Sequence, residues 1–379
     1  MSFTYRKATE NDREKYVDFA NLVFSNAHVP HDFETLIPKV YGRNRKTAYM
    51  QNIAVRDDGA IRGLVAVMPN TLKIMDFTLK TGYVGTVSVH PYARGEGHMK
   101  KLMAMAIEGM QNEEMDLAML GGQRQRYEYF GFTKGGVSLN HRVTSTNLRH
   151  VIGDASVDNI EIFDISEDDA QTIEKCSELH RSLKLSAERS IEDFHIICST
   201  WYAALKGINV DGEFAGFMVA KGEGISELRL YDQKLVPLVL KKYMQYANVT
   251  RIGISTGAYE TELNREFALL EEGMEIGTPE MLRIFNFPKV IGALMALKAS
   301  YGRLEDGVRA FVIDGNPMTV KVENGIPEVT DELCEGAVEL TAMQAQRLFL
   351  GFDGAVVVGD MLPLGWANLP LYMSHVDAF

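Results

Sequence analysis

The sequence has few cysteines, and it contains no long apolar run. Its three cysteines, Cys176, Cys198 and Cys334, are scattered and form no C-x-x-C motif. A disulfide framework or a zinc site is therefore not expected, and we predict no metal. No apolar run approaches the length of a membrane span, and the N-terminal residues do not resemble a signal peptide. We therefore expect a cytoplasmic protein without a membrane partner.

The sequence also lacks an excess of basic residues. Lysine and arginine together number 39, against 51 aspartate and glutamate residues, which gives a formal net charge of −12. Nucleic-acid binding requires a basic surface, so we expect no nucleic-acid partner. An acidic protein attracts cationic substrates over long range, although acidity serves solubility equally well.

The length and composition predict a globular protein of more than one domain. Apolar residues make up 46% of the chain and charged residues 24%, which is typical of a soluble globular protein. A chain of 379 residues is too long for a single core and should hold two or three domains.

Residues 85–110 have the pattern of a strand, a tight turn and a helix. Val87, Ser88 and Val89 lie in the predicted strand, which Pro91 ends because proline has no N–H to donate. After the turn, apolar residues recur at helical spacing. A glycine-rich turn that leads into a helix presents unpaired N–H groups and a positive dipole. The stretch therefore predicts a site for phosphate or pyrophosphate.

The turn itself supplies most of the candidate cofactor-binding residues. Gly95 and Gly97 lack the Cβ atoms that would keep a ligand away, and Arg94 and Lys100 add positive charge. The spacing is not that of a P-loop. It is not G-x-G-x-x-G either, because the third glycine after Gly95 and Gly97 is missing and Glu96 would face a pyrophosphate. The full candidate set is Val87, Ser88, Val89, Arg94, Gly95, Glu96, Gly97, His98, Met99 and Lys100.

This stretch is similar to the Arg-x-x-Gly-x-Gly/Ala signature of the GCN5-related N-acetyltransferases (GNAT). Residues 94–99 stand for the signature, and residues 87–91 stand for the family's V-x-V-x-P lead-in. Met99 departs from the usual glycine or alanine and would narrow the approach to the last phosphate. The resemblance implies acetyl-CoA as the co-substrate, with its pantetheine arm pairing with residues 87–89 where two strands diverge.

A second family feature is the Tyr-x-x-Phe-Gly-Phe run at residues 127–132. The resemblance implies that Tyr127 is a general acid, which would protonate the leaving coenzyme A thiolate. A phenol suits this role because it still holds its proton at neutral pH. The alternative is an aromatic that only packs, and this is the role we expect for Tyr129 and Phe130.

The rest of the chain resembles two further units. After residue 160 the order of elements resembles a second acetyltransferase fold, but no Arg-x-x-Gly-x-Gly turn follows any strand, so we expect a degenerate copy without coenzyme A. From about residue 281 the pattern resembles a sterol-carrier-protein-2-like domain, for which lipid binding is an alternative. We therefore predict an α+β protein with tandem GNAT folds and a sterol-carrier-like domain, divided into residues 1–142 (catalytic), 143–283 (degenerate) and 284–379.

Three units in this order resemble the enhanced-intracellular-survival (Eis) type of aminoglycoside N-acetyltransferases over the full length. In that family the α-carboxylate of the last residue is the general base, and Phe379 occupies that place here. A carboxylate with a free pKa of about 3.5 is a weak base, so burial would have to raise its pKa. The alternative is a frayed tail whose ring packs by chance. The resemblance also implies a homo-hexamer and a pocket open to several amines.

Two functions are consistent with these motifs and with the resemblance. The first is direct transfer of acetyl from acetyl-CoA to a primary amine of the aminoglycoside, lysine or polyamine type. No acyl-enzyme is expected, because no cysteine or serine lies in a recognisable nucleophile setting. The second is a catalytically silent protein that binds acyl-CoA or lipid, and Met99 and Glu96 are the residues that favour it.

Overall fold

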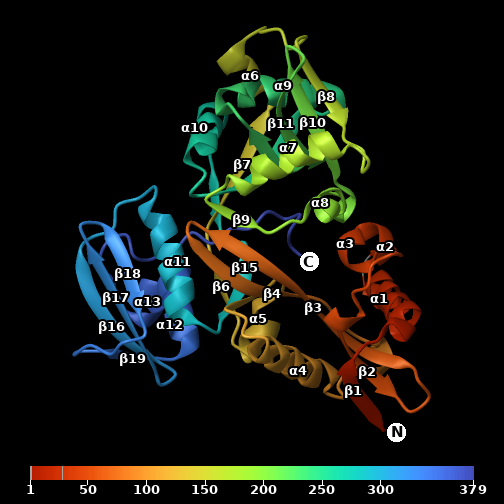
Figure 1. Cartoon of the computed structure of the whole chain (residues 1–379), viewed down its shortest axis with the longest axis vertical. Helices are drawn as coiled ribbons and strands as arrows, with labels where there is room; N and C mark the ends of the chain where they lie inside the picture. The colour runs from red at the N-terminus through yellow and green to blue at the C-terminus, as the bar shows by residue number, and fades with distance from the viewer. Residues whose placement is uncertain (1, 28) are drawn as a thin grey trace.

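The computed structural model describes residues 2–27 and 29–379, which form three β-sheets with helices packed on their faces (Figure 1). The sheets have eight, seven and four strands. In Figure 1 the first sheet lies in the centre, the second above it and the third beside it, and the C-terminal tail ends between the first two.

The first sheet contains the predicted phosphate turn. Its strands are β1 (Phe3–Lys7), β2 (Gln51–Arg56), β3 (Ile61–Ile74), β4 (Phe77–Val89), β5 (Leu117–Leu120), β6 (Thr133–Gly135), β9 (Leu185–Ala187) and β15 (Glu280–Ile284). They are arranged in the order β1-β2-β3-β4-β5-β15-β6, with β9 paired to β3. The sequence predicts one strand over residues 71–81, and this is wrong. The chain turns at Met75, which has a φ of 51°, and Thr71 pairs with Lys80.

Helices cover both faces of the first sheet. One face carries α4 (His98–Asn112), and the other carries α1 (Arg13–Ala27), α2 (Phe33–Leu36) and α3 (Pro38–Tyr41). Side chains of a strand alternate between the faces. Accordingly Val84 packs in the cluster under α4, which we call the α4 face, and Tyr83 packs in the cluster under α1–α3, which we call the α1 face.

The second sheet has helices on both faces as well. Its strands are β7 (Ser138–Thr144), β8 (Ile160–Asp164), β10 (Ala204–Val210), β11 (Glu213–Lys221), β12 (Gly224–Leu230), β13 (Arg251–Gly257) and β14 (Glu275–Gly277), in the order β14-β7-β13-β12-β11-β10-β8. One face carries α6 (Ser145–Ile152), α9 (Val236–Ala247) and α10 (Thr261–Leu270), and the other carries α7 (Ala170–Arg181) and α8 (Ile191–Cys198).

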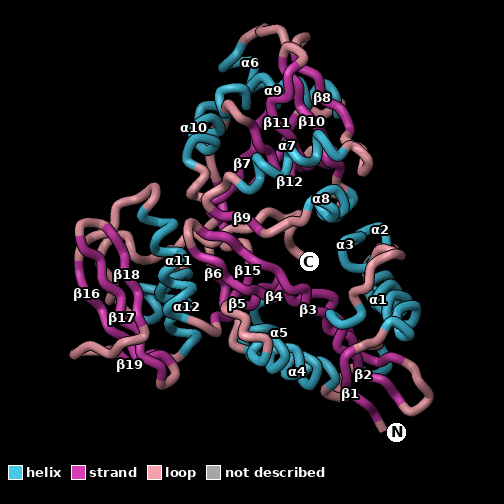
Figure 2. Tube along the Cα trace, in the orientation of Figure 1, coloured by secondary structure: helices cyan, strands magenta, loops and turns pink. Residues whose placement is uncertain are grey.

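The first two sheets exchange strands (Figure 2). After β6, the chain leaves the first sheet, and β7 pairs with β13 in the second. After β14 it returns, and β15 inserts between β5 and β6. The predicted boundaries at residues 142/143 and 283/284 each cut through one of these strands. A division of the chain into consecutive segments therefore does not describe which strands share a sheet.

The third sheet has the order β18-β17-β16-β19. Its strands are β16 (Gly307–Ile313), β17 (Asn316–Glu323), β18 (Ile326–Thr330) and β19 (Val338–Leu340), and the helices of this unit are α11 (Phe287–Ala299), α12 (Ala342–Leu350) and α13 (Gly354–Val358). The strand β18 is not predicted from the sequence. Within the described ranges, no helix combines the length and the apolar character that crossing a membrane requires.

Candidate active site

The turn between β4 and α4 has the backbone geometry of an anion site. Gly95 and Gly97 have φ values of +88° and +82°, in the left-handed region that favours glycine. No heavy atom lies within 4 Å of a Cβ built on either residue, so the turn is open. Gly97 precedes α4 and has no side chain to cap it, which leaves the N–H groups of the first helical turn available to a ligand.

The side chains around this turn fall into two groups. Arg94 and Lys100 are exposed, and Lys100 lies over the Tyr129 ring with its Nζ 4.9 Å from the ring centroid. His98 is buried instead, with its Nε2 3.0 Å from a Glu96 carboxylate oxygen. Arg94 and Lys100 can therefore approach a phosphate, whereas His98 can offer only its backbone N–H and the Glu96 carboxylate is held by His98.

Met99 does not line the open side of the turn. Its half-buried side chain packs against the apolar cluster of the α4 face. The narrowing that the sequence suggested at this position therefore does not come from an exposed methionine side chain. The larger side chain of Met99, where the family has glycine or alanine, is accommodated by packing against this cluster.

The strands β4 and β5 diverge beside the turn. They are paired in parallel at three positions only, the last being Tyr83 with Met119. β4 then continues to Val89, and no other described strand pairs with this side of it. Val87, Ser88 and Val89 lie along the unpaired edge, after a bulge in which Thr86 has a φ of 47°. The gap thus offers backbone N–H and C=O groups to an extended ligand.

Tyr127 lies at the β5 side of this gap. It is the last residue of α5 (Arg124–Tyr127), and its ring covers Gly122, where an added Cβ would lie 2.4 Å from Cε2. The side chain belongs to the cluster of the α4 face, and its burial raises its pKa above the ordinary value. The phenol therefore keeps its proton over the physiological range.

Phe379 lies at the β4 side of the gap. Its ring fills the space above Gly85, where an added Cβ would lie 1.8 Å from the Phe379 Cδ1 atom. The ring also meets the edge of Tyr41, with 6.1 Å between the ring centroids. Phe379 packs on the α1 face, so Tyr127 and Phe379 approach the same gap from opposite faces of the sheet.

Buried polar groups fix the tail that ends in Phe379. Lys39 of α3 donates hydrogen bonds to the carbonyl oxygens of Val376 and Ala378, at 2.5 and 2.6 Å. Arg189 donates two hydrogen bonds to the Asp377 carboxylate, at 2.8 and 2.7 Å. We call these contacts the tail anchor. The tail is therefore a packed segment and not a frayed end.

The tail anchor is electrostatically unusual. Burial lowers the pKa of Lys39 to about 7, while the Asp377 carboxylate opposes this shift and the Arg189 guanidinium adds to it. Arg189 also donates to Glu227, at 2.8 Å, so its charge is balanced by two carboxylates. The anchor therefore joins the first sheet, the second sheet and the tail.

Glu280 also lies at the gap, although the sequence does not predict it as a site residue. Antiparallel pairing of Met281 with Leu120 brings Glu280 opposite Gly121, at the end of β5. A Cβ added at Gly121 would lie 3.6 Å from the Tyr83 hydroxyl and 3.8 Å from Glu280 Oε2. No local signal could have revealed this contact, because β15 follows the whole second sheet in the chain.

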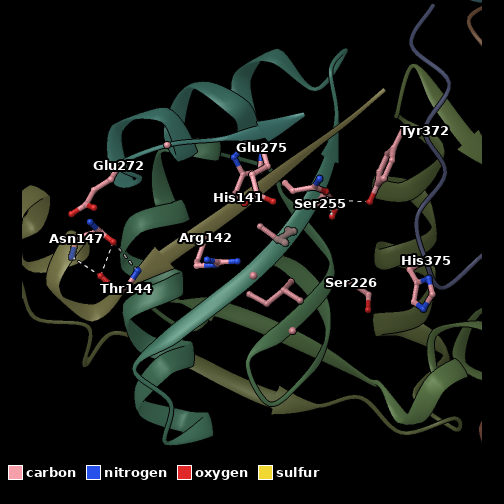
Figure 3. Close-up of a pocket in the computed structure, with 16 residues that line it drawn as sticks. His141, Arg142, Thr144, Asn147, Ser226, Ser255, Glu272, Glu275, Tyr372 and His375 are labelled. Atoms are coloured by element: carbon pink, nitrogen blue, oxygen red, sulfur yellow. Dashed lines mark hydrogen bonds between the residues drawn. The ribbon is translucent and has the colours of Figure 1, made fainter. Parts of the chain in front are cut away.

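The second sheet has a cavity of its own. It measures about 580 Å³ and is lined by β7, β12, β13 and the tail residues Tyr372 and His375 (Figure 3). The Tyr372 hydroxyl donates to the carbonyl of Ser255, at 2.7 Å. The loop that precedes α9 has no glycine-rich turn, and the Asp232 side chain already accepts from the backbone N–H of Lys234. This unit thus lacks the open anion site of the first sheet.

Two of the cysteines lie in the core. Cys176 and Cys198 are buried, and burial raises the pKa of Cys176 to about 12. Such thiols are inert as nucleophiles. Within the described ranges, no group of three or more histidine, cysteine, aspartate or glutamate residues is arranged to hold a metal ion.

Residues 4–135 match a family model described as an acetyltransferase (GNAT) domain. This segment contains the open turn, the diverging strands and Tyr127. No curated protein sequence matches the chain significantly. The match supports an acyltransferase enzyme and concerns residues 4–135 only.

Solved structures resemble the chain over nearly all of its length. A conserved protein of unknown function and probable N-acyltransferase from Enterococcus faecalis V583 has a TM-score of 0.69 at 12% identity, over 100% of both chains. A GCN5-related N-acetyltransferase from Kribbella flavida has 0.69 at 15%, over 100% of this chain and 98% of that one. Eis1 from Mycobacterium abscessus has 0.60 at 11%, over 92% and 90%.

At these identities the likeness concerns the fold alone. It agrees with the predicted mixture of helices and strands in a GNAT-like fold of several sheets. The sterol-carrier resemblance of the third unit stays a prediction.

Proposed function

We propose that this protein transfers the acetyl group of acetyl-CoA directly to a primary amine, with Tyr127 as general acid and the Phe379 α-carboxylate as general base. The observation that supports the proposal is the packing of the Phe379 ring against Gly85, at the gap where β4 and β5 diverge. A tail held by Lys39 and Arg189 keeps the terminal group beside that gap.

The turn would hold the cofactor's pyrophosphate. The open backbone at Gly95 and Gly97 and the N–H groups at the start of α4 favour an anion, and Arg94 and Lys100 supply positive charge. The unpaired edge of residues 87–89 would pair with the pantetheine arm. The thioester would then lie in the gap between Gly85 and Gly122.

The reaction needs two proton transfers. An alkyl amine with a pKa near 10 arrives protonated, so the Phe379 carboxylate accepts a proton before nitrogen attacks the acetyl carbon. The carbon–sulfur bond then breaks, and Tyr127 gives its proton to the thiolate of coenzyme A. Direct attack agrees with the burial of Cys176 and Cys198 and with their lack of thiolate character.

The acceptor is proposed as a cationic amine of the aminoglycoside, lysine or polyamine type. The formal net charge of −12 favours such a substrate through long-range attraction. A cytoplasmic location and a homo-hexamer remain predictions from the sequence, and light scattering of the purified protein would test the second.

The experiment measures thiol release from acetyl-CoA with a panel of primary amines, next to calorimetric titration with coenzyme A. Intact mass first verifies that Phe379 carries a free carboxyl group. We expect turnover with at least one amine, and a loss of more than about tenfold when Phe379 is deleted. Binding of coenzyme A without thiol release for every amine would instead support the silent binding protein.

A further inference from the structure

The carboxylate of Glu280 lies in the gap without an ionic partner. Its Oε2 atom is buried and forms no hydrogen bond of ordinary geometry with a described residue, although the Tyr83 hydroxyl lies close enough to stabilise the charge of the Glu280 carboxylate. Glu280 as a whole is half-buried. Lys134 is the nearby cation that stabilises the charge of Glu280 from a distance. The structure thus holds a half-buried carboxylate at the gap that is stabilised by the Tyr83 hydroxyl and by the distant Lys134.

The register of the strands brings this carboxylate opposite the Phe379 ring. Tyr83 of β4 pairs with Met119 of β5, so two residues further along Gly85 and Gly121 face each other across the gap. The Phe379 ring covers Gly85, and Glu280 Oε2 would lie 3.8 Å from a Cβ on Gly121. Tyr83 and Met119 both pack on the α1 face, so residues two positions later point to that face as well.

The separation of the two groups is set by the strands beneath them. Paired strands lie about 5 Å apart, and these two diverge, so the groups above them are separated by roughly 5–10 Å. This matches the spacing between two amino groups on one small molecule. Burial raises the pKa of Glu280, and a bound cation would oppose that shift by stabilising the carboxylate.

We propose that Glu280 binds a second positively charged nitrogen of the acyl acceptor, while the first nitrogen faces the Phe379 carboxylate. The substrate class is therefore a diamine or polyamine, or an amino sugar with two amines at that spacing. This inference rests on the proposed function, because it assumes that the acceptor enters the gap from the α1 face. Glu280 would be a specificity residue, since it orients the acceptor without exchanging a proton with it.

The test compares putrescine with n-butylamine, which has the same carbon chain but one amine. A charge-assisted contact of about 1.5–3 kcal/mol predicts that kcat/KM for putrescine exceeds that for butylamine by at least about tenfold. Glu280→Gln should abolish this preference through the KM for putrescine, and leave the KM for acetyl-CoA unchanged. Glu108→Gln, which removes an exposed carboxylate of α4, is the matched control and should keep the preference.

Binding separates failure of this inference from failure of the proposed function. Calorimetry of both amines with the coenzyme A complex needs no turnover. If putrescine binds more tightly and Glu280→Gln removes the difference, the inference holds even when no thiol is released. Equal binding and equal turnover of the two amines by the wild type overturn it, as does a preference that survives in a Glu280→Gln protein with unchanged melting temperature. Glu280→Asp, which keeps the charge but shortens its reach, should give an intermediate preference.

Discussion

Gly85→Ala tests whether the Phe379 ring must lie where it does. The new methyl carbon would lie 1.8 Å from the Phe379 Cδ1 atom, whereas ordinary contacts begin at 3.4 Å. The Phe379 ring must therefore move by about 1.6 Å, because the new methyl group is fixed to the backbone of β4 and cannot move away itself. The φ of Gly85 lies outside the left-handed region, so alanine fits the backbone itself.

The expected effects on catalysis and on folding are similar in free energy, but only the first changes turnover in the folded protein. A displacement of about 1 Å of a reacting group can cost roughly a hundredfold in rate, which corresponds to about 2.7 kcal/mol. Overpacking costs about 1–3 kcal/mol of stability. We expect kcat for thiol release to fall by about a hundredfold while coenzyme A still binds. Gly109→Ala on α4 is the control, because no heavy atom lies within 4 Å of its added Cβ.

A double-mutant cycle identifies the cause. If Gly85→Ala acts by moving the terminal ring, it should have little further effect in a protein from which Phe379 has been deleted. A Gly85→Ala protein with the turnover of the wild type would refute the reasoning. So would a hundredfold loss that persists in full without Phe379, because the methyl group would then act on the cofactor.

Three further substitutions test other parts of the site. Tyr127→Phe should lower kcat by more than about tenfold with the affinity for coenzyme A unchanged, whereas Tyr129→Phe, on an exposed ring, should have no effect. Gly97→Ala, at a φ of +82°, should raise the Kd for coenzyme A by about tenfold and, because the backbone is strained, lower stability by about 1 kcal/mol. An unchanged Kd in the folded variant would show that the turn does not bind the cofactor. Lys39 has a pKa of about 7 in the folded protein and about 10.4 in the unfolded chain. Between these pH values the unfolded state binds more protons than the folded state. The free energy of unfolding should therefore rise with pH, by up to about 1.4 kcal/mol per pH unit. Urea unfolding of Lys39→Met at pH 7 and pH 9 should lack this rise, and equal slopes in both proteins would contradict it.

The local parts of the site could be predicted from the sequence because neighbouring residues determine them. The turn at residues 94–97 is encoded by its own glycines, and α4 by the apolar spacing that follows. Where a turn lacks glycine, as at Met75, the apolar pattern continues across it and the sequence predicts one strand instead of two. Local patterns thus describe the cofactor turn better than the hairpin beside it.

The parts that were missed depend on pairing between distant segments. Glu280 reaches the gap only because β15 pairs with β5, and Arg189 meets Asp377 only because the tail crosses between two sheets. Nothing near either residue in the sequence indicates these partners. The tail anchor and the position of Glu280 at the gap therefore depend on the three-dimensional fold.

The insertion of β15 between β5 and β6 also bears on how the chain is made. The ribosome finishes β5 at residue 120, but must add 160 residues before β15 is available to pair with it. At about 5–20 residues per second this takes roughly 10–30 s, during which the edges of β5 and β6 are open to other nascent chains. The part of the enzyme that is synthesised first is thus among the last to close. A gene fragment that stops before residue 280 should yield aggregates and not a smaller enzyme.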